Sequence, residues 1–238
     1  MPKQLPRFEG RNTLLSTLSL EDQALISPYT SKVSLHRGMI LETPQRAVEC
    51  LLFPTSGVVS VAVSSEHLMC TIETGLFGFE GMSGASVLLN AKVPSTYLYV
   101  RISGSAAKID TTAYKGLVRE SWTIQRHFLK FTQSLITQTA YNAYVSRFDN
   151  IERRLARLLL MCHDRVLSDR IDITHQLLSK ILAVRRSGVT VATLALAGKG
   201  LIHAERGEIH IVDRSGLEKL VGNSYGPPEG EYNKLFKL

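Results

Sequence analysis

The sequence predicts an α+β protein with a β-rich N-terminal half, a long central helix and a helical C-terminal half. Between Val33 and about Asp110, short apolar segments alternate with glycine-bearing turns, which is typical of an all-β sandwich, barrel or jelly roll. After Tyr114, the stretch from Ser121 to Phe148 contains neither proline nor glycine, which indicates a long helix. Two short helical patterns and an alternating segment then follow, as in a winged helix-turn-helix.

Composition limits the class of protein. The 238 residues are 44% hydrophobic and 21% charged, so a packed core is expected. The net charge of +7 suits a polyanionic partner, and residues 147–206 hold 11 Lys and Arg against 6 Asp and Glu. The cysteines are far apart and form no CxxC, which disfavours a disulfide framework or a zinc site and fits a reducing cytoplasm. With no long apolar run, we expect neither a signal peptide nor a membrane span.

The N-terminal segment "LLSTLSLEDQALI", residues 14–26, predicts one or two short helices. Ser19, followed by Glu21 and Asp22, is a plausible helix start.

The long helix carries a seam of positions spaced alternately four and three apart, over about three heptads. Such a seam packs either on the helix's own domain or on a second helix, and spacing alone leaves both open. Its polar members favour a helix pair slightly, because polar seam residues fix register. The seam comprises Ile124, Phe128, Phe131, Leu135, Gln138, Asn142 and Val145.

A new segment begins near Phe148, where Asp149 and Glu152 have the spacing of a capping box. The following helix has an apolar face, and we expect its arginines, Arg153, Arg154 and Arg157, to be solvated.

The stretch "ITHQLLSKILAVRRSGVTVATLALAGKGLI" divides into two short helices. Thr174 caps the first, a corner follows at residues 183–185, and the second runs from about Arg186 to Ala197 before Gly198 stops it. Two helices joined by a three-residue turn form a helix-turn-helix, whose second helix enters the major groove of DNA. The competing interpretation is an ordinary helical hairpin with a solvated basic end.

The start of the second helix supplies the chemistry. A guanidinium matches guanine O6 and N7 or a phosphate, so we assign Arg186 to base edges and Arg185 mainly to phosphate. Ser187 and Thr190 are small hydrogen-bonding residues suited to a close DNA surface, and Gly188 permits close backbone approach. The predicted DNA contacts are Thr174, His175, Arg185, Arg186, Ser187, Gly188, Thr190 and Val191.

The segment "GLIHAERGEIHIVD" predicts a β-hairpin, because Ile209 and Ile211 alternate with polar residues after a turn. It is the wing of the motif, and Asp213 caps a short helix after it. The wing residues expected near the DNA backbone are His203, Arg206 and His210.

In this order of elements the chain resembles the Crp/Fnr (catabolite-activator) family of bacterial transcription regulators, from about Leu14 to Leu220. The resemblance is strongest in the helix-turn-helix, and looser in His36-Arg37-Gly38, Gly57 and "GLFGFEG". It implies an N-terminal double-stranded β-helix like a cyclic-nucleotide-binding domain. It also implies a homodimer joined through the long helix, a palindromic operator in double-stranded DNA, and contact with RNA polymerase. The seam would then be the dimer interface. Ser187, Val191 and Thr193 depart from the family's recognition helix, so base preference does not carry over.

In cyclic-nucleotide-binding members, a glycine-glutamate pair and a downstream Arg-Ser pair hold the ligand. Here Gly78 and Glu80 match the first pair, but Pro94 precedes Ser95 where the arginine is expected. A cyclic phosphate needs a cation or several donors, which nearby Lys92 alone would have to supply. We therefore predict no cyclic-nucleotide cofactor, with Gly78, Glu80 and Ser95 as the possible effector pocket. The absence of a cysteine cluster, with only Cys50, Cys70 and Cys162 present, rules out the family's iron–sulfur branch.

The sequence thus predicts a DNA-binding regulator of unknown effector, with no metal and no catalytic residue. A regulator under small-ligand control and one that has lost such control remain alternatives. An enzyme or metal protein using His36, Glu49 or Glu80 lacks a supporting motif such as HxH or HExxH. The predicted parts are a β-roll (1–115), a dimerisation helix (116–148), a winged helix-turn-helix (149–221) and a flexible tail (222–238).

Overall fold

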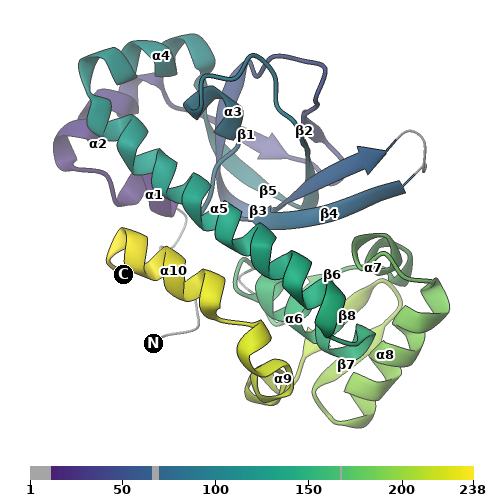
Figure 1. Cartoon of the computed structure of the whole chain (residues 1–238). Helices are drawn as coiled ribbons and strands as arrows, with labels where there is room; N and C mark the ends of the chain where they lie inside the picture. The colour runs from purple at the N-terminus through teal and green to yellow at the C-terminus, as the bar shows by residue number, and fades with distance from the viewer. Residues whose placement is uncertain (1–11, 66–69, 167) are drawn as a thin grey trace.

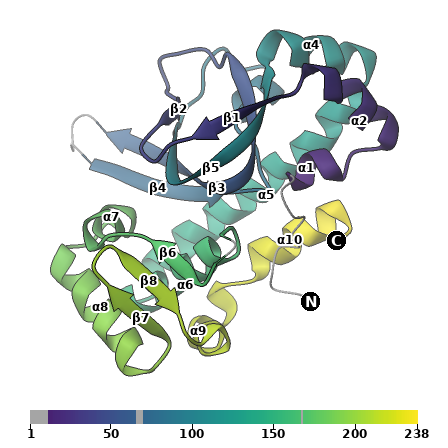
Figure 2. The same ribbon diagram turned by 180° about the vertical axis from the view of Figure 1, so that it is seen from behind.

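The structure is a computed structural model that describes residues 12–65, 70–166 and 168–238. A β-roll forms the N-terminal half, and a smaller domain of helices and short strands forms the C-terminal half (Figure 1). The long helix α5 (Trp122–Phe148) runs past both halves, and the C-terminal helix lies alongside it (Figures 1 and 2).

The first described elements are α1 (Thr13–Ser16) and α2 (Leu20–Ile26), which confirms the predicted N-terminal helices. Ser19 caps α2, because its hydroxyl accepts a hydrogen bond from the Asp22 amide at 3.1 Å. A 3-10 turn, η1 (Ser27–Tyr29), leads into the roll.

The roll is one antiparallel sheet in the order β1-β5-β3-β4, with β2 also paired to β5. The two longest strands pair with several register shifts around Gly57, which has a φ of +84°. At this bend a Cβ on Gly104 would lie 2.2 Å from the Ser56 carbonyl oxygen, so only glycine fits. The elements are β1 (Ser31–Leu35), β2 (Ile40–Glu42), β3 (Cys50–Ser65), β4 (Cys70–Phe77), α3 (Ala85–Leu88) and β5 (Tyr97–Asp110).

The predicted helix over 116–148 is two helices, α4 (Thr111–Glu120) and α5. They separate at Ser121, whose backbone is extended. The hydroxyls of Ser121 and Thr123 each donate to the Asp22 carboxylate at 2.7 Å. The break is therefore held against α2.

The seam of α5 faces this chain's own roll. Ile124 and Phe128 are fully buried, and the Phe131 ring meets the Phe77 ring edge-on with centroids 5.5 Å apart. A Cβ on Gly81 would lie 2.6 Å from the Phe131 ring, so the helix and the roll are in close contact.

The polar seam residues bind the backbone of β4. The Gln138 side-chain oxygen accepts from the Leu76 amide at 2.7 Å, and the Asn142 amide donates to the Thr74 carbonyl at 2.7 Å. The prediction that the seam is the dimer interface is therefore wrong, because these side chains are already used within the chain. The other two seam residues, Leu135 and Val145, are partly and fully buried.

The C-terminal domain has the predicted winged arrangement, with one added strand. Asn150, rather than Asp149, caps its first helix, and the Asp149 carboxylate instead accepts from Arg153 at 3.0 Å. A three-stranded sheet in the order β6-β8-β7 carries the wing. The elements are α6 (Ile151–His163), β6 (Arg170–Asp172), α7 (His175–Ile181), α8 (Arg186–Gly198), β7 (Ile202–Glu205), β8 (Glu208–Ile211) and α9 (Arg214–Val221).

The predicted flexible tail is structured, which corrects the prediction for residues 222–238. After a 3-10 turn, η2 (Gly222–Ser224), the helix α10 (Pro227–Phe236) packs along α5 (Figure 1). The Tyr232 and Phe236 side chains are 1% and 7% exposed. The Tyr232 hydroxyl donates to the Glu80 carbonyl at 2.8 Å, which joins the C-terminal helix to the roll.

Two buried ion pairs lie where the halves of the chain meet. Arg165, two residues after the end of α6, pairs with Glu80 of the roll at 2.7 Å, and both side chains are 3% exposed. Arg101 of β5 pairs with Glu73 of β4 and also donates to the Cys162 sulfur of α6 at 3.4 Å. The domains are therefore joined by charged contacts as well as apolar ones.

Candidate nucleic-acid interface

Helices α7 and α8 form the predicted helix-turn-helix, with an angle of 107° between them. This angle lies in the range of DNA-binding helix-turn-helix motifs. Thr174 caps α7, accepting from the Leu177 amide at 3.2 Å. In the turn, Ala183 takes a left-handed backbone with φ +50°, which reverses the chain tightly.

Helix α8 has one buried face. Val189 and Leu196 are fully buried and Ala192 is 4% exposed, so this face packs against the rest of the domain. The opposite face is open: Val191 and Leu194 are 67% and 66% exposed. A helix fixed in this way presents one constant face to a partner.

The two arginines lie at the start of α8, with Arg185 at the N-cap and Arg186 as the first helical residue. Both are exposed. Neither guanidinium has a hydrogen-bond or ion-pair partner within the part of the chain that the structure describes. Cations at the positive end of a helix dipole are unfavourably placed. An anionic partner would relieve this repulsion, and the site is suited to phosphate or to the acceptor edges of bases.

Some predicted contacts are used inside the motif instead. Thr190 donates to the Arg186 carbonyl at 3.2 Å and is 3.2 Å from His175 Nδ1, so it joins the two helices. A Cβ on Gly188 would lie 3.2 Å from Ile151 Cδ1, so this glycine lets α8 approach α6. Gly188 thus has a packing role in the domain, and its close approach to DNA stays a prediction. Ser187 is exposed beside these residues.

The wing is a hairpin between β7 and β8 with exposed Arg206 at its turn. Its histidines face carboxylates: His203 lies 3.1 Å from Glu205, and His210 lies 3.0 Å from Glu208. Arg206 is therefore the wing cation best placed for a phosphate.

The arginines of α6 are a set that the sequence did not reveal, and the prediction that they are solvated is wrong. Each donates to a carbonyl at the C-terminal end of another helix, where such carbonyls lack helical partners. Arg153 donates to the Val221 carbonyl at 2.8 Å, Arg157 donates to Ser224 at 2.6 Å, and Arg154 donates to Leu182. They hold α7, α9 and η2 around α6.

The predicted effector residues are not brought together. Glu80 faces Arg165, and the Gly78 amide donates to the Glu80 carboxylate at 3.0 Å, so this pair is turned towards α6. Ser95 instead lines a separate cavity of about 220 Å³ inside the roll.

The ionisable group that lines the roll cavity is Glu42, not an arginine. Burial raises the pKa of the Glu42 carboxyl to about 7, although it accepts from the Gly84 amide at 2.5 Å. Lys92 is exposed and does not line this cavity. A buried carboxyl is the wrong chemistry for a phosphate.

Two further features bear on the class of protein. No group of three or more His, Cys, Asp or Glu side chains within 12–65, 70–166 and 168–238 is arranged to hold a metal. No single described helix is long and apolar enough to cross a membrane, and α7 with α8 passes that test only as a bent pair.

Comparisons with known proteins agree with this geometry. Residues 153–220 match the Crp-like helix-turn-helix domain family. A search of curated proteins finds no significant match.

Solved structures of similar fold were also found. One is a proposed Crp/Fnr-family regulator from Eubacterium rectale, at 20% identity, covering 88% of this chain and 97% of that one, with a TM-score of 0.65. Another is a CRP-family regulator from Thermus thermophilus, at 15% identity, with coverages of 80% and 96% and a TM-score of 0.66. A third is the c-di-GMP-responsive regulator CLP of Xanthomonas campestris, at 17% identity, with coverages of 81% and 99% and a TM-score of 0.63. At these identities the likeness shows the fold.

Proposed function

Since residues 153–220 are a Crp-like helix-turn-helix domain in a chain with the fold of Crp/Fnr regulators, we propose that this protein is a sequence-specific, DNA-binding transcription regulator. It acts as a homodimer on a palindromic operator in the cytoplasm, with RNA polymerase as a further partner. It is a binding protein rather than an enzyme. The observation that carries the proposal is the pair of exposed arginines at the start of α8, which have no partner among the described residues.

The two arginines have separate roles. Arg185 is the extended N-cap residue and lies outside the helix, whereas Arg186 is the first residue of α8. Arg186, inside the helix, reads base edges in the major groove, and Arg185, at the cap, binds phosphate.

Arg186→Ala is expected to weaken operator binding by about 1–3 kcal/mol and to relax base preference at one position of each half-site. The measurement is fluorescence anisotropy with an operator selected from random DNA by the wild-type protein. Arg119→Ala is the matched control, because it removes the same charge from an exposed site on α4. If Arg186→Ala and Arg119→Ala bound the operator with equal affinity, Arg186 would not be a base-reading residue.

The dimer in this proposal uses the face of α5 opposite the seam. Its positions recur four and three residues apart, as in a coiled coil, and are exposed or partly exposed. Ile136 is 59% exposed, Trp122 is 63% exposed, and the Arg126 guanidinium lies over the Trp122 ring at 5.3 Å. The stripe comprises Trp122, Arg126, Leu129, Gln133, Ile136, Ala140, Ala143 and Arg147.

Ile136→Glu is expected to convert the dimer to folded monomers, because it places like charges opposite each other in the interface. Sedimentation equilibrium measures the mass, and the thermal melt reports the fold. Leu20→Glu, at an 83% exposed position far from this face, should leave the dimer intact. An Ile136→Glu protein that stays dimeric would place the interface elsewhere.

The proposed regulator does not use cyclic nucleotide in its roll. The support is that Glu42, a carboxyl, lines the roll cavity and that Glu80 is paired with Arg165. A different effector site is therefore needed if the protein responds to a small molecule.

A further inference from the structure

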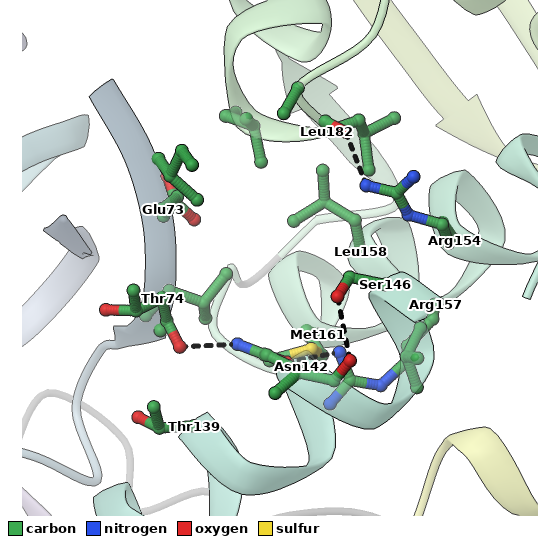
Figure 3. A pocket seen from close by; sticks show the side chains of 17 residues that line it. Glu73, Thr74, Thr139, Asn142, Ser146, Arg154, Arg157, Leu158, Met161 and Leu182 are labelled. Atoms are coloured by element: carbon green, nitrogen blue, oxygen red, sulfur yellow. Dashed lines mark hydrogen bonds between the residues drawn. The ribbon is translucent and has the colours of Figure 1, made fainter. Parts of the chain in front are cut away.

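A larger cavity, of about 510 Å³, lies between the roll and the helix-turn-helix. Its walls come from β4, α5, α6 and α7 together with the turn after α7. In Figure 3, Glu73 and Thr74 lie on one side, and Arg154, Leu158 and Leu182 lie on the other. The volume is in the range of small-molecule sites.

The charge on the walls is unbalanced. Arg154 is partly buried, and burial lowers the pKa of its guanidinium. In the described residues its guanidinium donates only to the Leu182 carbonyl, and no carboxylate is within ion-pair distance. Glu73, the carboxylate on the facing wall, is already paired with Arg101 and accepts from the Tyr99 hydroxyl at 3.1 Å. Asp149 attracts Arg154 only from beyond ion-pair distance, and the one carboxylate in the described lining of the cavity is already paired.

Arg157 adds a second positive charge to the same wall. It is 5% exposed and donates to the Asn142 side chain at 2.5 Å and to the Ser224 carbonyl at 2.6 Å. Its Nη2 is buried and has no hydrogen-bond partner among the described residues. No carboxylate forms an ion pair with it in the part of the chain described. Asp149 attracts both guanidiniums and Glu229 attracts Arg157, but within the described residues each acts from beyond ion-pair distance. An anion in the cavity would therefore be the first to contact these charges directly.

The rest of the lining is largely apolar, with hydroxyls at one side. Leu158, Met161 and Val145 are buried, and Thr139 and Ser146 are exposed on α5. Such a lining buries the apolar body of a ligand, while the arginines bind its acid group.

We propose that this interdomain cavity binds a small organic anion with an apolar body and is an effector site. A ligand there touches β4 of the roll and the end of α7 at once, and Arg154 lies between the ligand and the Leu182 carbonyl of the helix-turn-helix. The affinity for the ligand therefore depends on the position of the roll relative to the helix-turn-helix. By linkage, binding of the ligand changes the affinity of the protein for DNA. The regulatory part rests on the proposed function, but the binding itself does not.

The first experiment uses 1-anilinonaphthalene-8-sulfonate as the probe with the full chain. Fluorescence titration should show one saturable site per chain, with binding at least tenfold weaker in Arg154→Gln. Thr139→Trp, which fills the cavity from an exposed position and leaves the arginines in place, should also abolish binding.

N-phenyl-1-naphthylamine, the probe without its sulfonate, should bind wild type and Arg154→Gln alike. Arg119→Gln is the matched charge control, and thermal melts confirm that each variant is folded. If Arg154→Gln and Thr139→Trp both bound the sulfonate probe as tightly as wild type does, the proposed site would be wrong.

The second experiment separates this proposal from the function. Operator affinity is measured for wild type and Thr139→Trp with and without saturating probe. A severalfold change in wild type, absent in Thr139→Trp, is expected for an effector site. No change in wild type would overturn the regulatory role. Loss of DNA binding by all proteins without probe would instead overturn the proposed function, while probe binding would still stand.

Discussion

Arg165→Met is expected to lower the free energy of unfolding by about 3–5 kcal/mol. The substitution leaves the Glu80 carboxylate, which is 3% exposed, without its counter-ion in the interior. Burial lowers the pKa of the Arg165 guanidinium, but the carboxylates of Glu80 and Asp164 outweigh it, so the pKa rises and the charge is retained. Urea unfolding followed by circular dichroism provides the measurement.

The second substitution distinguishes a lost ion pair from lost packing. Adding Glu80→Gln to Arg165→Met removes the orphaned charge and should recover about 0.5–3 kcal/mol. Arg170→Met removes a 56% exposed side chain that pairs with Asp172 and Glu208 and should change stability by less than about 1 kcal/mol. Similar losses in Arg165→Met and Arg170→Met would mean that the Glu80 contact contributes no more than a surface pair.

Tyr232→Ala is expected to destabilise the protein by about 3–5 kcal/mol, because it removes a buried aromatic ring and leaves a cavity. Tyr232 is 1% exposed, and its ring centroid is 4.6 Å from that of Phe236. The same urea series gives the value.

Two tyrosine variants calibrate this result. Tyr232→Phe keeps the ring and loses only the hydrogen bond to the Glu80 carbonyl, so about 0.5–1.5 kcal/mol is expected. Tyr29→Ala, at a 50% exposed position, should have a much smaller effect. If Tyr232→Ala matched Tyr29→Ala, α10 would not be docked in solution.

The sequence predicted the DNA-binding half well because its signals are local. Thr174 and Asp213 each cap the predicted helix, as Ser19 does in the N-terminal half, and each side chain accepts from the amide three positions later. The start of α8 at Arg186 is also as predicted. Asn150 was missed because Asp149 is an equally good cap residue and lies next to it.

The partner of a helix face is not a local property. Heptad spacing identified the seam from Ile124 to Val145, but the same spacing serves packing on a sheet or on a second helix. The hydrogen bonds of Gln138 and Asn142 to β4 decide between them, and they join residues 62 and 68 positions apart. No short window of sequence contains that information.

The C-terminal helix was missed for a different reason. Glycine and proline in "GPPEGEY" suggested a mobile tail, but proline is well suited to the first turn of a helix. Tyr232 and Phe236 are four residues apart, which gives the short helix one apolar face. That spacing was the signal available in the sequence.

The contacts of α6 have a consequence for how the protein opens. Arg153, Arg154 and Arg157 each hold the end of a different helical segment, at sequence distances of 68, 28 and 67 residues. Unwinding α6 would release α7, α9 and η2 together, so none of them can fray independently at the end held by an arginine. We therefore expect α7, α9 and η2 to open together with α6 as one foldon, and α6 to be the slowest of them to exchange its amide hydrogens.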